Sequence, residues 1–143
     1  MNTMLCEDAE WLCSEEAFSV YKHCMYKPEY KDFRAKMERY ISEPSVKMFV
    51  CSAEGIKAGL LVLHVSGDTA EIEGIAVSEK FRRRGAGSSM ILNAAGILGL
   101  KSLAAQTDDD AIGFYRKCCF KEERLIIEYP DGTAVRYNCT LEL

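Results

Sequence analysis

Apolar residues recur along the first third of the chain at the spacing of an amphipathic helix. Between residues 7 and 25 they form one stripe that includes Trp11, Phe18 and Tyr21. The same spacing returns between Pro28 and Pro44, with charged residues on the opposite face. We therefore expect two helices here. The helical signal starts so early that no strand is visible before it.

The period then changes to the alternation of β-strands, interrupted by turn residues. The pattern predicts strands at 46–52, 56–66 and 69–77, joined by Glu54-Gly55 and by Gly67-Asp68. A glycine-rich turn at 85–87 leads into a further helix, whose apolar face includes Met90 and Ala94.

The last part of the chain predicts a strand, a helix and a hairpin. We expect a short buried strand at 103–107, a helix capped by Asp108, and a final hairpin of 120–129 with 133–143. The whole order is two helices, an antiparallel meander, a helix, a strand, a helix and a hairpin. It predicts one mixed α/β domain over residues 1–143, with a mostly antiparallel central sheet flanked by helices.

Composition narrows the classes of partner and location. Apolar residues make up 48% of the chain, charged residues 28%, and the net charge is -4, so a nucleic-acid or anionic-membrane partner is not expected. The acidic N-terminus does not resemble a secretory signal, and no apolar run could span a bilayer. Seven cysteines without a CxxC pair favour reduced, mostly buried thiols and no metal site, in a cytoplasmic protein.

The glycine-rich turn carries the densest chemical signal. Gly85 and Gly87 would let a ligand approach the backbone, and the free amides at a helix N-terminus attract phosphate. A solvated basic loop before a helix is the alternative interpretation. Ser88 stands where an ATP-binding P-loop needs Lys, and Met90 stands where a dinucleotide fingerprint needs Gly.

Two motifs resemble one known family. Arg82-x-x-Gly85-x-Gly87, preceded by a strand that ends at Val77, is similar to the coenzyme A signature of the GNAT acetyltransferases. The segment TDDDAIGFYRKCCF at 107–120 resembles that family's Asn-x-x-Ala-x-x-Phe-Tyr-x-x-x-Gly-Phe element. The resemblance covers about residues 46 to 125. It implies a GNAT-like domain whose sheet is splayed at an acetyl-CoA site.

The resemblance also assigns residues to acetyl-CoA, the expected co-substrate. It implies that backbone groups of β-strand residues hold the pantetheine arm, with the amide of Ile75 directed at the thioester carbonyl. It implies that the loop amides hold the pyrophosphate. The expected contacts are Ile75, Ala76, Val77, Arg82, Arg83, Arg84, Gly85, Ala86, Gly87, Ser88, Asp108 and Phe114.

The second motif departs from the family at two positions. Asp108 replaces the family Asn, which keeps a hydrogen-bond acceptor but loses an amide donor. Cys119 replaces the Gly before the final Phe, which suggests a different turn.

Acetylation of an amine needs an acid for the departing thiolate and a base for the amine. Tyr115 matches the family's acid, and a phenol of pKa ~10 is close enough to a thiol of ~8.5 for proton transfer. Glu71 and Glu73 are the candidate bases, because alternation would place both on the same strand face as Ile75. Tyr115 could instead belong only to the core, and both glutamates could be merely solvated. No His near Cys118 and Cys119 supports an acyl-enzyme, so direct transfer is expected.

The acceptor stays open at this stage. By analogy, the first two helices and the final hairpin line its pocket, and their carboxylates and aromatic rings suit a cationic amine. A peptide N-terminus, lysine, polyamine, aminoglycoside or amino acid would all fit, and homodimerisation is also open. The alternative functions are a non-catalytic module that binds coenzyme A, and a nucleotide-binding or structural protein that uses the same loop.

Overall fold

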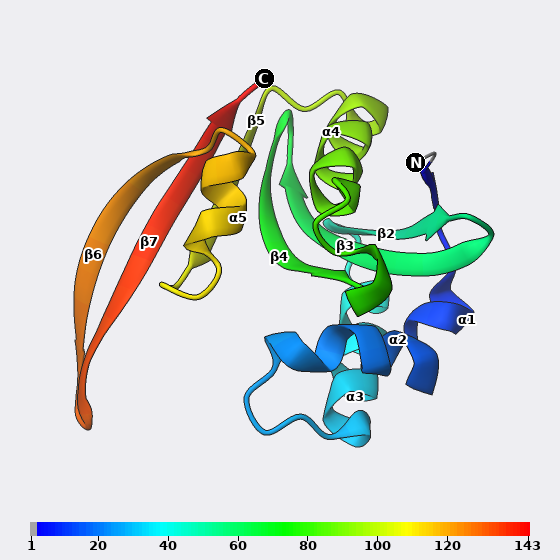
Figure 1. Ribbon diagram of the computed structural model, residues 1–143, viewed down its shortest axis with the longest axis horizontal. Helices are drawn as coiled ribbons and strands as arrows, with labels where there is room; N and C mark the ends of the chain where they lie inside the picture. Colours follow the sequence, from blue (N-terminus) through cyan, green and yellow to red (C-terminus); the bar gives the residue numbers. More distant parts are fainter. Residues whose placement is uncertain (1–2) are drawn as a thin grey trace.

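Seven strands form one sheet in the order β1-β2-β3-β4-β5-β7-β6 in the computed structural model, which describes residues 3–143 (Figure 1). All neighbouring strands are antiparallel except β4 and β5, which run parallel on either side of a helical crossover. This confirms the mixed, mostly antiparallel sheet. The strands are β1 (Thr3–Cys6), β2 (Val46–Ala53), β3 (Ile56–Ser66), β4 (Thr69–Val77), β5 (Ser102–Thr107), β6 (Lys121–Tyr129) and β7 (Gly132–Glu142).

Helices cover both faces of the sheet because the strands alternate two apolar sets. Leu60 and Val62 of β3 pack toward the N-terminal helices, whereas Leu61 and Leu63 pack toward the later ones. The first layer comprises α1 (Ala9–Leu12), α2 (Glu15–Tyr21), the 3-10 turn η1 (Lys22–Cys24) and α3 (Tyr30–Ser42). The second comprises α4 (Ala86–Leu98) and α5 (Ile112–Lys117), and the 3-10 turn η2 (Glu79–Phe81) leads into α4.

The expectation of one helix over residues 7–25 is wrong. The segment is divided at Ser14, whose hydroxyl donates to the carbonyl of Trp11 and accepts from the amide of Ala17. It therefore ends α1 and starts α2 with the same side chain. The strand that the sequence hid is β1, which pairs with the end of β2. Its four residues are too few for the alternation to be recognised.

The remaining boundaries follow the sequence closely. The bounds of β3 and β4 are those expected, and the other predicted strands differ from expectation by one residue at one or both ends. The helix expected after Pro28 begins at Tyr30 and ends before Pro44. None of the helices formed within residues 3–143 is long and apolar enough to cross a bilayer.

The expected burial of the thiols is wrong for most of them. Cys51 and Cys139 are buried in the core, but Cys6, Cys24 and Cys119 are exposed. All seven are free thiols. No hydrophobic pattern reveals this, because it depends on where each turn and strand edge faces solvent.

The sheet divides between its two parallel strands. β4 pairs with β5 only from Thr69–Ile72, against Ser102–Ala105. Beyond Ile72 the two strands separate, and β4 continues to Val77 with β3 as its only strand neighbour. This separation gives the sheet its expected splayed shape and positions the site described next.

Candidate functional site

A cleft of ≈ 1010 Å³ opens where β4 and β5 separate. Its walls come from the end of β4, the loop before α4, the first turn of α4, the end of β5 and one side of α5. Most of the residues selected from the sequence lie together on these walls: Glu73, Ile75, Ala76, Val77, Arg82, Arg83, Gly85, Ala86, Gly87, Ser88, Asp108, Phe114 and Tyr115.

Two of the selected residues lie elsewhere. Arg84 does not line the cleft; it donates to Glu54 at 2.7 Å and lies over the ring of Phe81. Glu71 lines a second, smaller cavity at the other end of β4. Neither position could be read from the sequence, because the partner of Arg84 belongs to a distant hairpin and Glu71 lies where β4 is still paired with β5.

The N-terminus of α4 is open toward the cleft. Gly85 precedes the helix with φ of 80°, a left-handed conformation that glycine adopts at little cost, and no side chain caps the first turn. No acidic residue lies in that turn. The amides of Ala86, Gly87 and Ser88 therefore keep their hydrogen-bonding capacity, and the helix dipole makes this end positive. The arrangement suits a phosphate group.

Gly87 also has a packing role that the sequence did not reveal. A Cβ at this position would lie 2.7 Å from Cε1 and 3.0 Å from Cζ of Phe114. The missing side chain thus lets the ring of Phe114 pack against the first turn of α4. This contact couples the two motifs, which are far apart in sequence.

The free edge of β4 presents backbone groups to the cleft. The amide of Ser78 donates to Ala58 on the β3 side, so alternation directs Val77 and Ile75 to the opposite edge. The contacts agree with this: the carbonyl of Val77 accepts from Nε of Arg82, and that of Ile75 lies 3.5 Å from Sγ of Cys24. The amide of Ile75 points the same way and can pair with an extended ligand.

Tyr115 belongs to both the core and the cleft. Its ring is 6% exposed and packs edge-on against Phe114 and Phe120. Burial is the main cause that raises the pKa of Tyr115 well above that of an ordinary phenol, and the nearby thiols Cys139 and Cys118 act in the same direction. The hydroxyl therefore stays protonated at physiological pH.

The two departures from the second motif leave its shape intact. The Asp108 carboxylate accepts from the amides of Asp110 and Ala111 at 3.0 and 3.1 Å, which organises the turn before α5. Cys119 has φ of 66°, in the left-handed region that glycine favours. The backbone at Cys119 thus has a conformation that glycine would adopt without strain, and the chain accepts the strain of a non-glycine residue there.

A β-bulge corrects the expected placement of the glutamates. Ile72 pairs with Leu63 and Gly74 with Val62, so Glu73 is an extra residue in β4. The bulge resets the alternation: Ile75 pairs with Leu61 and faces α4, whereas Glu71 pairs with His64 on the other face. Glu73 also lies toward the N-terminal helices: burial is the main cause that raises the pKa of Tyr21 and of Tyr40, and the nearby charge of Glu73 adds to it. The expectation that Glu71, Glu73 and Ile75 lie on the same strand face is therefore wrong.

The sequence matches the family model of the acetyltransferase (GNAT) family over residues 8–120. The chain belongs to the GNAT family. The match extends well before residue 46, where the two motifs had placed the start of the resemblance. No curated protein matches the sequence significantly.

Solved structures with this GNAT fold cover nearly the whole chain. The ribosomal-protein-S18-alanine N-acetyltransferase from Escherichia coli has a TM-score of 0.71 at 17% identity, covering 99% of this chain and 94% of its own. The spermidine/spermine N-acetyltransferase from Vibrio cholerae has a TM-score of 0.71 at 15% identity, and the match covers 98% of this chain and 92% of its own. An IAA acetyltransferase from Bacillus cereus has a TM-score of 0.65 at 16% identity, and the match covers 99% of this chain and 100% of its own. At such identities these similarities establish the fold.

The cleft of this GNAT protein has further walls that the motifs did not indicate. Among them, Lys117 follows Tyr115 by two residues. The sequence did not single it out, because a charged residue on a helix surface usually faces only solvent. Cys24 and Arg136 come from η1 and β7, and only the tertiary structure brings them here. The additional lining residues are His23, Cys24, Gln106, Thr107, Asp110, Ala111, Lys117, Cys118 and Arg136. Within residues 3–143 no three His, Cys, Asp or Glu side chains are grouped as a metal site.

Proposed function

We propose that this GNAT protein transfers the acetyl group of acetyl-CoA to a primary amine by direct attack. The observation that carries the proposal is the continuity between the unpaired edge of β4 and the uncapped N-terminus of α4. An extended chain with a pyrophosphate at one end would find backbone groups along its length and amides at its end. Family membership supports this cofactor.

In this proposal each part of acetyl-CoA has a binding surface. The amides of Ala86–Ser88, with Arg82 and Arg83, hold the pyrophosphate. Ile75, Ala76 and Val77 hold the pantetheine arm. The amide of Ile75 donates to the thioester carbonyl, which gains negative charge as the amine attacks.

The proton steps use Tyr115 and Glu73. The amine attacks the thioester carbon and the carbon–sulfur bond breaks. The departing thiolate takes the phenolic proton of Tyr115, which regains a proton from solvent; burial raises the pKa of this phenol, which keeps it protonated but makes it a weaker acid than an exposed tyrosine. Glu73 is exposed in the cleft and accepts the proton from the amine, directly or through water. Glu71 lies in the other cavity and is therefore a weaker candidate for the general base than Glu73.

Calorimetry and a thiol-release assay test the two halves of this proposal. Acetyl-CoA should bind, and ATP and NAD should not; no heat with acetyl-CoA contradicts the binding site. Amine-dependent release of free thiol should follow. Binding without thiol release for any primary amine would leave a non-catalytic module that binds coenzyme A.

Two conservative variants test the proton steps. Tyr115→Phe keeps the ring in the core and should lower turnover by ~10- to 10⁴-fold with little change in acetyl-CoA affinity. Glu73→Gln should cost more activity than Glu71→Gln on a monoamine, and the loss should shrink as pH rises and free amine becomes abundant. Wild-type rates for Glu73→Gln across pH 6 to 9 would contradict its role as base.

A further inference from the structure

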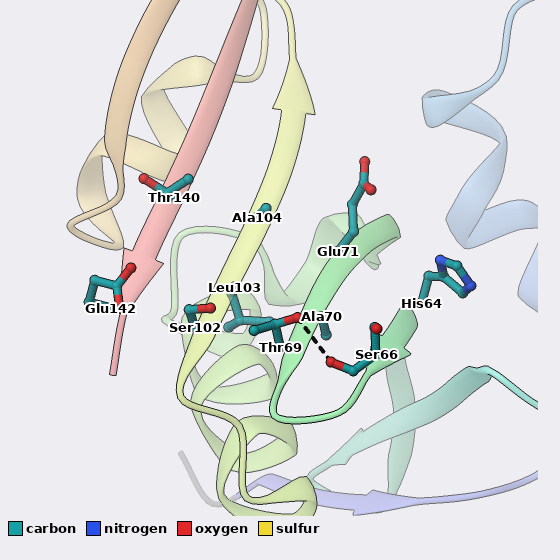
Figure 2. A pocket seen from close by; sticks show the side chains of 10 residues that line it. All are labelled: His64, Ser66, Thr69, Ala70, Glu71, Ser102, Leu103, Ala104, Thr140 and Glu142. Carbon is teal, nitrogen blue, oxygen red and sulfur yellow. Dashed lines mark hydrogen bonds between the residues drawn. The ribbon is translucent and has the colours of Figure 1, made fainter.

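A second cavity lies beside the cleft, at the closed end of the β4–β5 pair. It has a volume of ≈ 270 Å³ (Figure 2). Glu71 and His64 rise from adjacent strands on the same side of the sheet, and the hydroxyl groups of Ser66, Thr69, Ser102 and Thr140 line the rest of the cavity (Figure 2). The lining residues are His64, Ser66, Thr69, Ala70, Glu71, Ser102, Leu103, Ala104, Thr140 and Glu142.

This cavity continues the cleft along the same two strands. Glu71 and Ala104 line the cavity, whereas Glu73 and Gln106, two residues further along β4 and β5, line the cleft. Glu71 and Glu73 both lie on the face of the sheet that carries the N-terminal helices. A ligand that extends along this face of β4 would reach from the cleft to Glu71.

The polar groups of the cavity suit a cation. Glu71 and Glu142 are exposed carboxylates, and within residues 3–143 neither forms an ion pair. Among the described residues, no Lys or Arg lines the cavity. Lys121 stands opposite Thr140 in the register, but on the outer strand β6. His64 shares a hydrogen bond with Ser45 at 2.9 Å, which fixes its ring at the rim.

The spacing defines the length of the ligand. Glu71 lies two residues before Glu73 on β4, and Thr69, at the far wall of the cavity, lies two residues before Glu71. A ligand that starts at Glu73 and ends in the cavity therefore extends ~7 to 13 Å along the strand. We propose that the acceptor is an extended aliphatic diamine. One nitrogen reacts beside Glu73, and the second, as an ammonium, binds Glu71 in this cavity, where Glu142 adds negative charge from the other side of β5 (Figure 2). The inference rests on the proposed transferase function and names its substrate class.

Three amines of equal chain length separate this idea from its alternatives. Cadaverine has an ammonium at the far end, pentylamine a methyl group, and δ-aminovaleric acid a carboxylate. With acetyl-CoA saturating, cadaverine should have at least a ~10-fold higher kcat/KM than the other two, the effect of one charge-assisted contact. Glu71→Gln should reduce this preference to about 2-fold or less, mainly through KM, and Glu142→Gln should reduce it partly. The exposed Glu128 on β6 offers a control, Glu128→Gln, which should keep the full preference.

Binding measurements separate the subsite from the chemistry. Calorimetry of cadaverine with the coenzyme A complex should give heat that Glu71→Gln abolishes and Glu128→Gln retains. Turnover with equal rates for all three amines, or a preference for the amino acid, would overturn the cation subsite and leave the transferase function standing. Binding of cadaverine that depends on Glu71, without turnover, would support the subsite and contradict the transferase. If cadaverine neither binds nor turns over, the diamine proposal is overturned, and thiol release with other primary amines decides the transferase function separately.

Discussion

Replacing Gly87 by alanine tests the contact that joins the two motifs. The new Cβ would lie 2.7 Å from Cε1 of Phe114, whereas carbon atoms pack best at about 3.5–4.0 Å. Relieving an overlap of this kind costs about 1–3 kcal/mol. Alanine regains up to about 1 kcal/mol from its higher helix propensity. We therefore expect Gly87→Ala to destabilise the protein by about 0–2 kcal/mol.

Gly96 in the same helix supplies the matched control. It is exposed, and a Cβ there would meet no atom within 4 Å. Gly96→Ala should therefore stabilise the protein by up to about 1 kcal/mol. The difference in free energy of unfolding between the two variants, measured by urea denaturation, isolates the overlap with Phe114 and should be about 1–3 kcal/mol.

A third variant and a binding assay complete this test. Phe114→Leu in the Gly87→Ala background should recover part of the lost stability, as coupled residues in contact do. Acetyl-CoA affinity should fall in Gly87→Ala but not in Gly96→Ala, because Phe114 lines the cleft. If Gly87→Ala proves as stable as Gly96→Ala and binds acetyl-CoA normally, the packing argument is refuted.

Three further outcomes can be measured. Cys119→Gly should raise the free energy of unfolding by about 1 kcal/mol by relieving the left-handed strain, whereas Cys119→Ala should not; equal stability of the two variants would remove the strain argument. Alkylation of Cys24, followed by mass spectrometry, should slow when acetyl-CoA is present, while that of Cys6 on β1 should not; equal protection would mean that the ligand does not reach η1. Burial raises the pKa of Tyr115 and of Tyr21, so above pH ~10 the unfolded chain loses phenol protons that the native protein keeps, and stability falls with pH. Tyr115→Phe should flatten part of that decline in denaturation measured between pH 9 and 11, and an unchanged slope would contradict the burial argument.

Local patterns in the sequence determined most of the elements. The continuous apolar run of β3, which is buried on both faces from Ala58 to Leu63, and the alternation at the start of β4 predicted the bounds of these strands. The glycines of the loop before α4 predicted an open helix N-terminus, since a residue at φ of 80° strongly favours glycine. These features depend on a few neighbouring residues, and the two motifs made their placement more specific.

The sequence by itself therefore determined most helices and strands, except β1 and the division at Ser14, together with the mixed sheet and the two motifs that line the cleft. Only the tertiary structure decided which glutamate shares that cleft. The bulge at Glu73 arises from pairing with Val62 and Leu63, so alternation along β4 alone gave the wrong face. The same holds for Arg84, which Glu54 draws away, and for Cys24, which η1 brings to the carbonyl of Ile75. Register and long-range contacts depend on both partners, and a pattern read along one strand contains only one of them.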